Sequence, residues 1–198
     1  MTTNKRQTRV REQQESYTDP YAAYPLIEER YEVIEGVRYD LKPAPTVHHQ
    51  QLVTSIWGSL SDTCAMNGEI FVSPIDVYLN EDYQFQPDII FITNENRSII
   101  KKKRIEGAPD LIVEILSPST GWKDKQKKKE AYGLFGVKEY WLVDPHLQTV
   151  DQLVLIDGEL QLHQTYGHLD TLTAEQFPCI SVDFEKLFGA LIKFEDDE

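Results

Sequence analysis

The stretch APDLIVEILSPST, residues 108–120, places one carboxylate inside an almost continuous apolar run. Leucine, isoleucine and valine side chains flank Glu114 on both sides, and Pro109 and Pro118 bound the run. A short run rich in β-branched residues is typical of a strand that is covered on both faces of a sheet. Burying an unpaired carboxylate there is strongly unfavourable. The sequence therefore predicts that Glu114 contacts a metal ion, with a salt bridge to a buried lysine as the alternative.

Hydrophobic patterns elsewhere predict an α/β domain with a central mixed β-sheet flanked by helices. Alternation around Glu35-Gly36 indicates a β-hairpin over residues 31–41, and apolar residues at helical spacing indicate a helix over residues 46–67. A second helix is expected from Ser119, a suitable N-cap, to the C-cap Gly136. Further strands are expected at residues 69–79 (interrupted by Pro74), 86–93 and 139–145, and a hairpin at residues 149–166 with its turn at Asp157-Gly158.

Length and composition fit one domain. A chain of 198 residues, 40% hydrophobic, can form one sizeable core, which we expect over residues 21–192. Residues 1–20 are polar and are expected to form a flexible arm, and residues 193–198 an acidic tail. No run approaches the ~18 apolar residues of a membrane span, and the N-terminus has no secretory signal. We therefore expect a cytoplasmic protein without membrane contact.

Cys64 and Cys179 are far apart in the sequence and have no CxxC spacing. Neither a zinc site nor a disulfide framework is therefore indicated. We expect both residues to be thiols in a reducing compartment.

The net charge of −13 argues against indiscriminate binding to nucleic acid. The charge is unevenly distributed, however. Between Lys101 and Lys129 there are eight lysines and one arginine against four acidic residues, a local balance of +5, so the remainder carries −18. Such a basic block is either a solvated face or, if it lies beside a site of chemistry, a phosphate-binding surface.

Two carboxylates come from neighbouring predicted core strands, because Asp88 opens the strand DIIFI and Glu114 lies within the next strong strand. Hard cations such as Mg²⁺ bind one or two carboxylates together with water and substrate phosphate. Nucleases with this arrangement carry a lysine two residues after the glutamate, on the same face of the strand, but here that position is Leu116. The following helix offers a substitute.

At 100° per residue, Lys128 falls at the centre of the apolar, sheet-facing side of this helix, together with Asp124 and Tyr132. A lysine on that face requires a partner. Asp124 precedes it by four residues in the favourable order, so one interpretation is that the two merely neutralise each other at the edge of the core. The other is that Lys128 extends toward Glu114.

Six motifs occur in order over roughly residues 30–160: YEVIEG, HQQLV, QPDIIFI, GAPDLIVEILSPST, D-x-x-x-K-x-x-x-Y from Asp124 to Tyr132, and GVKEYWLVDP. Together they resemble the Uma2 family of restriction-endonuclease-like proteins. The resemblance implies the PD-(D/E)XK nuclease fold, in a version in which the lysine has moved from the strand to the helix. That agrees with Leu116 and Lys128. Gly121-Trp122 departs from the family, in which arginines are common at this place.

Residue by residue, the resemblance implies an active site of Glu35, Asp88, Glu114 and Lys128, supported by His49, Asp124 and Tyr132. Asp88 and Glu114 would bind Mg²⁺ or Mn²⁺ for hydrolysis of phosphodiester bonds, with DNA as the expected substrate. Phosphates of the nucleic acid would contact the basic block: Lys101, Lys102, Lys103, Arg104, Lys123, Lys125, Lys127 and Lys129. Because cutting both strands of a duplex needs two active sites, a homodimer is expected.

Other functions are open on the sequence. The same fold could serve as a catalytically inactive nucleic-acid-binding module or as a protein-interaction domain. A hydrolase built on His48 and His49 is weakly indicated, because adjacent side chains on an extended segment point apart. Trp122, near the start of the second helix, could stack on a base or could be a packing cap.

Overall fold

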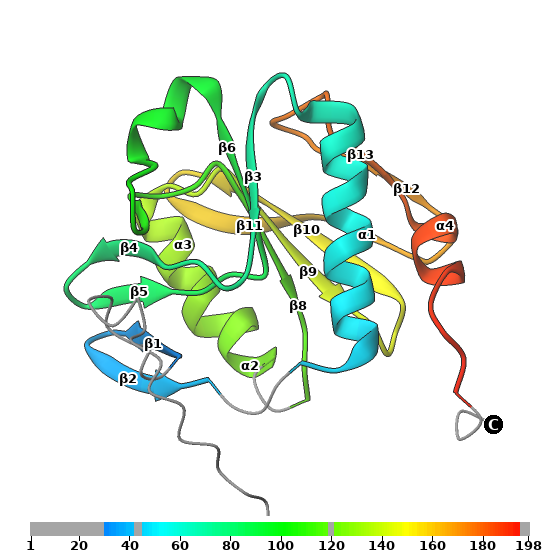
Figure 1. The fold of residues 1–198 in the computed structure, drawn as a ribbon, viewed down its shortest axis with the longest axis horizontal. Coiled ribbons are helices and arrows are strands. Elements are labelled where there is room, and N and C mark those ends of the chain that lie inside the picture. Colours follow the sequence, from blue (N-terminus) through cyan, green and yellow to red (C-terminus); the bar gives the residue numbers. More distant parts are fainter. Residues whose placement is uncertain (1–29, 42–44, 119–120, 195–198) are drawn as a thin grey trace, which may run out of the picture. The chain divides into compact units, whose positions relative to one another are not determined.

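A six-stranded mixed sheet with the order β11-β10-β9-β8-β6-β3 forms the centre of the fold (Figure 1). Its strands are β3 (Gly68–Val72), β6 (Ile89–Thr93), β8 (Leu111–Ile115), β9 (Glu139–Asp144), β10 (Thr149–Ile156) and β11 (Glu159–Tyr166). β8 and β9 run parallel, and the other neighbours are antiparallel. The predicted α/β class with a mixed central sheet is confirmed.

This computed structural model describes residues 30–41, 45–118 and 121–194. The predicted polar arm at residues 1–20, the N-cap Ser119 and most of the predicted acidic tail lie outside them.

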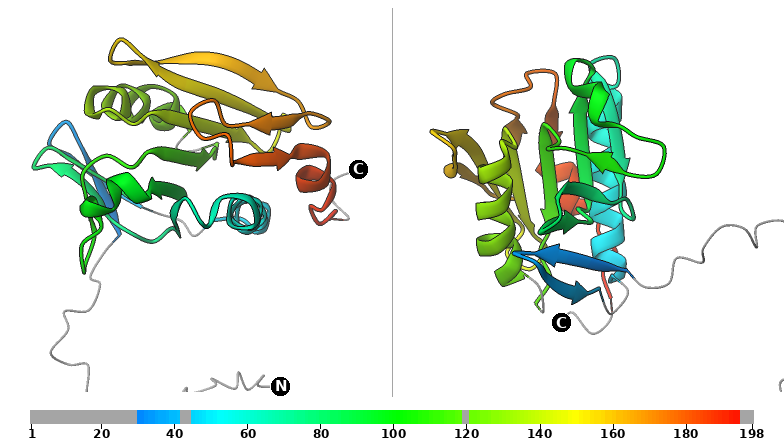
Figure 2. Two further views of the ribbon diagram at one scale, coloured as in Figure 1. Left: turned by 90° about the horizontal axis from the view of Figure 1, so that it is seen from above. Right: turned by 90° about the vertical axis from the view of Figure 1, so that its left-hand side faces the viewer.

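Helices cover both faces of the central sheet (Figure 2). On one face lies α1 (Val47–Cys64), which begins after the N-cap Thr46, whose hydroxyl accepts a hydrogen bond from the His49 amide. On the other face lies a helix in three parts: α2 (Gly121–Lys123), the π-helical turn η2 (Asp124–Lys128) and α3 (Lys129–Phe135). It ends at Gly136 in the left-handed conformation, as predicted. Within the described residues, no helix is long and apolar enough to cross a membrane.

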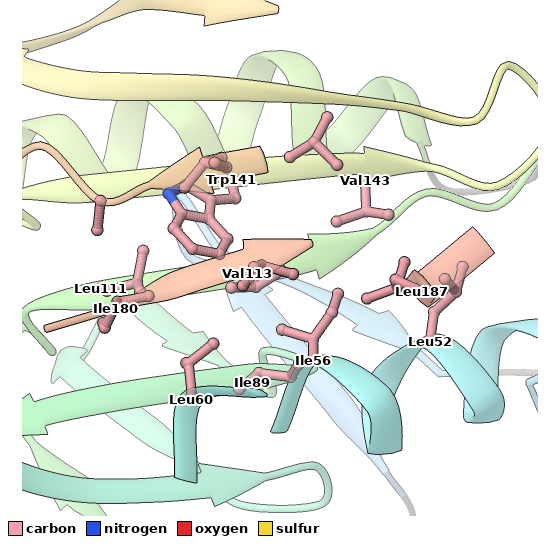
Figure 3. Packing of buried hydrophobic residues seen from close by; sticks show 14 of the residues in the cluster. Leu52, Ile56, Leu60, Ile89, Leu111, Val113, Trp141, Val143, Ile180 and Leu187 are labelled. Atoms are coloured by element: carbon pink, nitrogen blue, oxygen red, sulfur yellow. The ribbon is translucent and has the colours of Figure 1, made fainter. Parts of the chain in front are cut away.

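Alternation along the strands divides the core in two. On β8, Leu111, Val113 and Ile115 pack toward α1, together with Trp141 of β9, as Figure 3 shows for several of them. Ile112 points to the opposite face, where it joins a second apolar cluster under α3. All five residues of β8 are buried. Glu114 shares the face of Ile112, because successive side chains on a strand alternate.

A second, five-stranded sheet with the order β2-β1-β5-β4-β7 lies on the α3 side of the fold and was not predicted. Its strands are β1 (Tyr31–Ile34), β2 (Val37–Asp40), β4 (Val77–Asn80), β5 (Tyr83–Phe85) and β7 (Ile105–Glu106), and the 3-10 helix η1 (Asn94–Ile99) precedes β7. The β1–β2 hairpin turns at Glu35 and Gly36, both with positive φ, as the sequence predicted.

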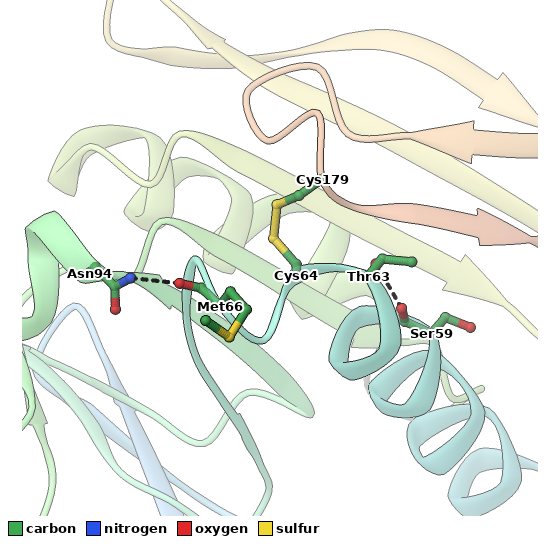
Figure 4. The surroundings of a disulfide bond; sticks show 6 residues. All are labelled: Ser59, Thr63, Cys64, Met66, Asn94 and Cys179. Atoms are coloured by element: carbon green, nitrogen blue, oxygen red, sulfur yellow. Dashed lines mark hydrogen bonds between the residues drawn. A yellow bond between two sulfur atoms is a disulfide. The ribbon is translucent and has the colours of Figure 1, made fainter.

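The C-terminal part of the chain forms β12 (Thr171–Thr173), β13 (Ser181–Asp183) and α4 (Phe184–Gly189), which pack with α1. Cys64 at the end of α1 and Cys179 form a disulfide, with their Cα atoms 5.2 Å apart (Figure 4). The prediction of two thiols is therefore wrong. The cysteines are 115 positions apart and carry no local spacing signal, because the packing of the C-terminal segment against α1 is what brings them together.

Candidate active site

The ammonium group of Lys128 lies among three carboxylates. Its Nζ is 2.9 Å from Oε1 of Glu114, 2.9 Å from Oε1 of Glu32 and 3.1 Å from Oδ1 of Asp124. These side chains come from β8 in the central sheet, β1 in the second sheet and η2. All four are buried, and the Lys128 side chain is 6% exposed. Lys128 therefore does more than neutralise its neighbour Asp124.

Glu114 is held by two donors. Lys128 Nζ and the Tyr132 hydroxyl both donate to its Oε1, at 2.9 and 3.1 Å. Leu116 follows on the same face of the chain and packs against the cluster under α3. The ammonium thus reaches the strand from the helix, on the face where a lysine at position 116 would have started.

Burial and like charges act together on the cluster. Burial raises the pKa of Glu114 well above its usual value, and the carboxylates of Asp124, Asp88 and Glu32 raise it further against the opposing effect of Lys128. Burial would lower the pKa of Lys128, but Asp124, Glu114 and Glu32 outweigh it, so this pKa is raised well above its usual value. One ammonium is shared by more carboxylates than it can neutralise.

The helix widens where it meets this cluster. Asp124 and Lys128 are the first and last residues of the π-helical turn, and both are buried. The Asp124 carbonyl accepts a hydrogen bond from the Tyr140 hydroxyl of β9 at 3.1 Å, which ties this turn to the sheet. Single π-helical turns inside α-helices often occur at functional sites.

The hairpin contributes Glu32 to the cluster. Glu32 is buried, and its Oε1 also accepts the backbone N–H of Gln86 at 3.1 Å. Glu35, which the family pattern suggested, lies exposed in the turn and pairs with Lys127 at 2.6 Å. Sequence reasoning missed Glu32. The signal was present, since a turn at Glu35-Gly36 with Ile34 buried places Glu32 on the buried face.

Asp88 lies directly before β6 and is tied to the residue after Glu114. Its Oδ2 accepts the backbone N–H of Ile115 at 2.8 Å and lies 3.1 Å from Nε2 of His49 in the first turn of α1. Asp88 and His49 are both mostly buried. His48, in contrast, binds the carbonyl of Ile192 with Nε2 at 2.6 Å and packs on Phe194, so it points to the C-terminal segment.

The basic block is divided in space. Lys123 and Lys125 lie on the helix that carries Lys128, and Lys123 Nζ sits 4.1 Å from the ring centre of Tyr39 in β2. Residues 101–104 instead precede β7, at the opposite edge of the second sheet from the β1–β2 hairpin. There Lys101, Lys102 and Lys103 are exposed, and Arg104 pairs with Glu106 and covers the ring of Tyr78.

Among the described residues, no three histidine, cysteine, aspartate or glutamate side chains are grouped so as to hold a metal ion by themselves. Mg²⁺ needs fewer protein ligands, because water and substrate phosphate complete its shell. The donor chemistry fits such an ion: Asp88 and Glu114 supply hard oxygens from neighbouring strands, and the surplus of buried carboxylates is a charge that a divalent cation would offset.

Comparisons with known proteins identify the family and the fold. The sequence profile of the Uma2 family, described as "Putative restriction endonuclease", matches residues 19–185. Five solved chains match the structure. One is described as "a putative nuclease belonging to DUF820" from Anabaena variabilis; it is 21% identical, with a TM-score of 0.68 over 86% of this chain and 96% of that one. At this identity the likeness shows a shared fold. No curated protein matches the chain.

Proposed function

Because the chain belongs to the Uma2 family of restriction-endonuclease-like proteins, we propose that it is a metal-dependent endonuclease that hydrolyses phosphodiester bonds of nucleic acid, DNA being the expected substrate. The observation that supports this most directly is the contact between Lys128 on the helix and Glu114 on β8. This contact joins a cation and a carboxylate from separate elements at one buried point. Asp88 lies beside it, because its Oδ2 accepts the backbone N–H of Ile115, the residue after Glu114.

Asp88 and Glu114 would hold the Mg²⁺ or Mn²⁺ ion, which would supply Lewis acidity at the scissile phosphate. Lys128 would face the charge that develops on a phosphate oxygen. We assign to Glu32 the supporting contact that the family pattern suggested for Glu35, because Glu32 reaches Lys128.

Three further residues would orient these groups. Tyr132 holds Glu114 by a hydrogen bond, Asp124 holds Lys128 by an ion pair, and His49 contacts Asp88. Their role is positional, since each acts on a proposed active-site side chain.

Nucleic acid would enter along the helix, which carries Lys123, Lys125 and Lys127 in addition to the buried Lys128. Residues 101–104 would contact phosphates farther from the site. A homodimer acting in the cytoplasm completes the proposal.

The test combines cleavage with cation binding. Wild-type protein is expected to cut DNA with Mg²⁺ or Mn²⁺. Glu114→Gln should abolish cutting and weaken Mn²⁺ binding in calorimetry. Lys128→Met should keep Mn²⁺ binding but reduce the cleavage rate by about 10²-fold or more. Lys186→Met is the control, because Lys186 is an exposed lysine on α4, outside the proposed site and the basic block; it should cut at nearly the wild-type rate.

A catalytically inactive binding module is the second candidate, and one observation favours it. The ammonium of Lys128 is already engaged by three carboxylates, which is also how a structural ion cluster would look. Wild-type protein that binds nucleic acid and Mn²⁺ but cleaves neither DNA nor RNA would establish this alternative. Cleavage by folded Lys128→Met at the wild-type rate would refute the role of Lys128.

A further inference from the structure

An exposed tryptophan lies near the start of the helix that carries Lys128. Trp122 is the second residue of α2 and is 49% exposed, so about half of it is accessible to a ligand. The Gly121 amide donates to the carbonyl of Ser117 at 2.9 Å, and a Cβ on Gly121 would lie 3.6 Å from Leu116. This segment therefore packs on the end of the strand that carries Glu114. Trp122 belongs to the same end of the sheet as the carboxylate–lysine cluster.

Two cation–aromatic contacts involve the β1–β2 hairpin, and one of them is made by Lys123, the residue after Trp122. Lys123 lies over the ring of Tyr39 at 4.1 Å, and Arg38 lies over the ring of Tyr31 at 4.3 Å. Both tyrosines are on the β1–β2 hairpin, which also supplies Glu32. Surfaces that bind single-stranded nucleic acid combine the same two components: cations follow the phosphates, and aromatic rings stack on the bases.

We propose that the site takes unpaired nucleotides, and that the indole of Trp122 stacks on a base next to the phosphate at the site. This inference rests on the proposed nuclease function and names its substrate class. A base inside a duplex is already stacked and paired, so an indole at the protein surface can stack on it only where the strand is open. The charge agrees, because the −18 carried outside residues 101–129 would repel a long duplex, whereas a short open strand needs only the local basic surface.

The chain contains its own control. Trp57 is 45% exposed, nearly the same fraction as Trp122, but it lies on α1, on the other face of the sheet. Trp141 is fully buried. Changes in tryptophan fluorescence on binding can therefore be assigned by replacing Trp57 or Trp122 in turn.

The experiment measures binding without cleavage, in EDTA and at low salt. Fluorescence anisotropy of labelled oligothymidylate, oligouridylate and a DNA duplex of equal length gives the dissociation constants for wild type, Trp122→Ala, Trp122→Phe and Trp57→Ala. We expect wild type to prefer single strands, and Trp122→Ala to bind them about 5- to 150-fold more weakly. Trp122→Phe should retain most of the affinity, because it keeps an aromatic face, and Trp57→Ala should bind like wild type. The tighter of the two oligonucleotides identifies the strand as DNA or RNA, and either result fits the proposal.

Two results would overturn it: equal binding by wild type and folded Trp122→Ala, or a preference of wild type for the duplex. Quenching of Trp122 fluorescence by oligothymidylate in Trp57→Phe provides a second measurement that needs no alanine variant, and its absence would also overturn the proposal. Failure of the proposed nuclease function would give a different result. If wild type binds single strands through Trp122 but does not cleave them with Mg²⁺ or Mn²⁺, the stacking site is supported and the nuclease activity is refuted.

Discussion

Three carboxylates share the ammonium of Lys128, and this excess of negative charge determines how the cluster responds to pH. The pKa of Glu114 is raised in the folded protein by burial and by the neighbouring carboxylates. Over the pH range between its unfolded value, near 4.5, and its raised folded value, the native state holds a proton that the unfolded chain has lost. Native stability therefore falls as the pH rises through that range.

Glu114→Gln tests this directly, because glutamine resembles the protonated carboxyl in shape. The variant has no titrating group at position 114, so its stability lacks this dependence on pH. The free energy of unfolding of wild type should therefore fall relative to that of Glu114→Gln as the pH rises above about 4.5. Urea denaturation across this pH range measures the difference. A variant less stable than wild type by the same large amount at every pH would mean that Lys128 needs an ionised Glu114.

The hairpin offers a second test at the level of single residues. Glu32→Gln should lower Mn²⁺ affinity or the cleavage rate by about 10- to 100-fold, as expected for a group that orients active-site side chains. Glu35→Gln, three residues along the same hairpin, should leave both nearly unchanged, because Glu35 is exposed. Steady-state cleavage and calorimetry measure the two effects. A larger effect of Glu35→Gln than of Glu32→Gln would assign the supporting contact at the active site to Glu35.

Sequence alone identified the side of the helix on which Lys128 lies, because helical spacing and the apolar neighbours determine it. It placed Glu114 among apolar residues and favoured a metal ion as its partner, with a lysine as the alternative; in the structure Lys128 and Tyr132 contact it. The hairpin alternation places Glu32 on the buried face, a signal that the sequence interpretation did not use. The partner of Glu32, Lys128, could not be predicted from the hairpin, because that contact comes from the packing of one sheet against the helix.

At the level of elements, local signals were reliable. The turns at Glu35-Gly36 and Asp157-Gly158 and the helix end at Gly136 were predicted because positive φ favours particular residues. The π-helical turn at residues 124–128 was not predicted. Its sequence, DKQKK, fits an ordinary helix, and its contacts with the sheet come from elsewhere in the chain.

Two glycines give opposite predictions for their elements. A Cβ on Gly68, the first residue of β3, would lie 2.2 Å from the carbonyl oxygen of Ile92. Gly68→Ala should therefore lower the free energy of unfolding by about 1–3 kcal/mol or more. Gly58 lies in α1 with nothing within 4 Å of an added Cβ, so Gly58→Ala should raise it by about 0.5–1 kcal/mol. Urea denaturation of both variants measures the two changes in the free energy of unfolding. A Gly68→Ala protein as stable as wild type would contradict the close approach of β3 to β6.

For the whole molecule, the distribution of charge matters more than the net value. The basic residues 101–104 and those on the helix lie at separate places, although the sequence shows one block. The sequence could not reveal this, because the second sheet, which separates them, is assembled from strands far apart in the chain.

Salt dependence of nucleic-acid binding can separate the two groups. Replacing Lys101, Lys102 and Lys103 with glutamine should flatten the slope of log affinity against log salt by about 0.7–0.9 for each phosphate that these lysines neutralise. Replacing Lys123 and Lys125 should flatten it as well and should also weaken binding close to the site. Titrations at several salt concentrations give the slopes. An unaltered slope in the triple variant would place residues 101–103 outside the nucleic-acid-binding surface.

The disulfide between Cys64 and Cys179 joins residues that are 115 positions apart, so it closes the chain between them into a covalent ring. Asp88, Glu114 and Lys128 all belong to this ring. A protease that cuts the exposed Lys101–Lys103 segment would open this ring without releasing a fragment. The two halves of the site, Asp88 on one piece and Glu114 with Lys128 on the other, would remain one molecule until a reductant separated them.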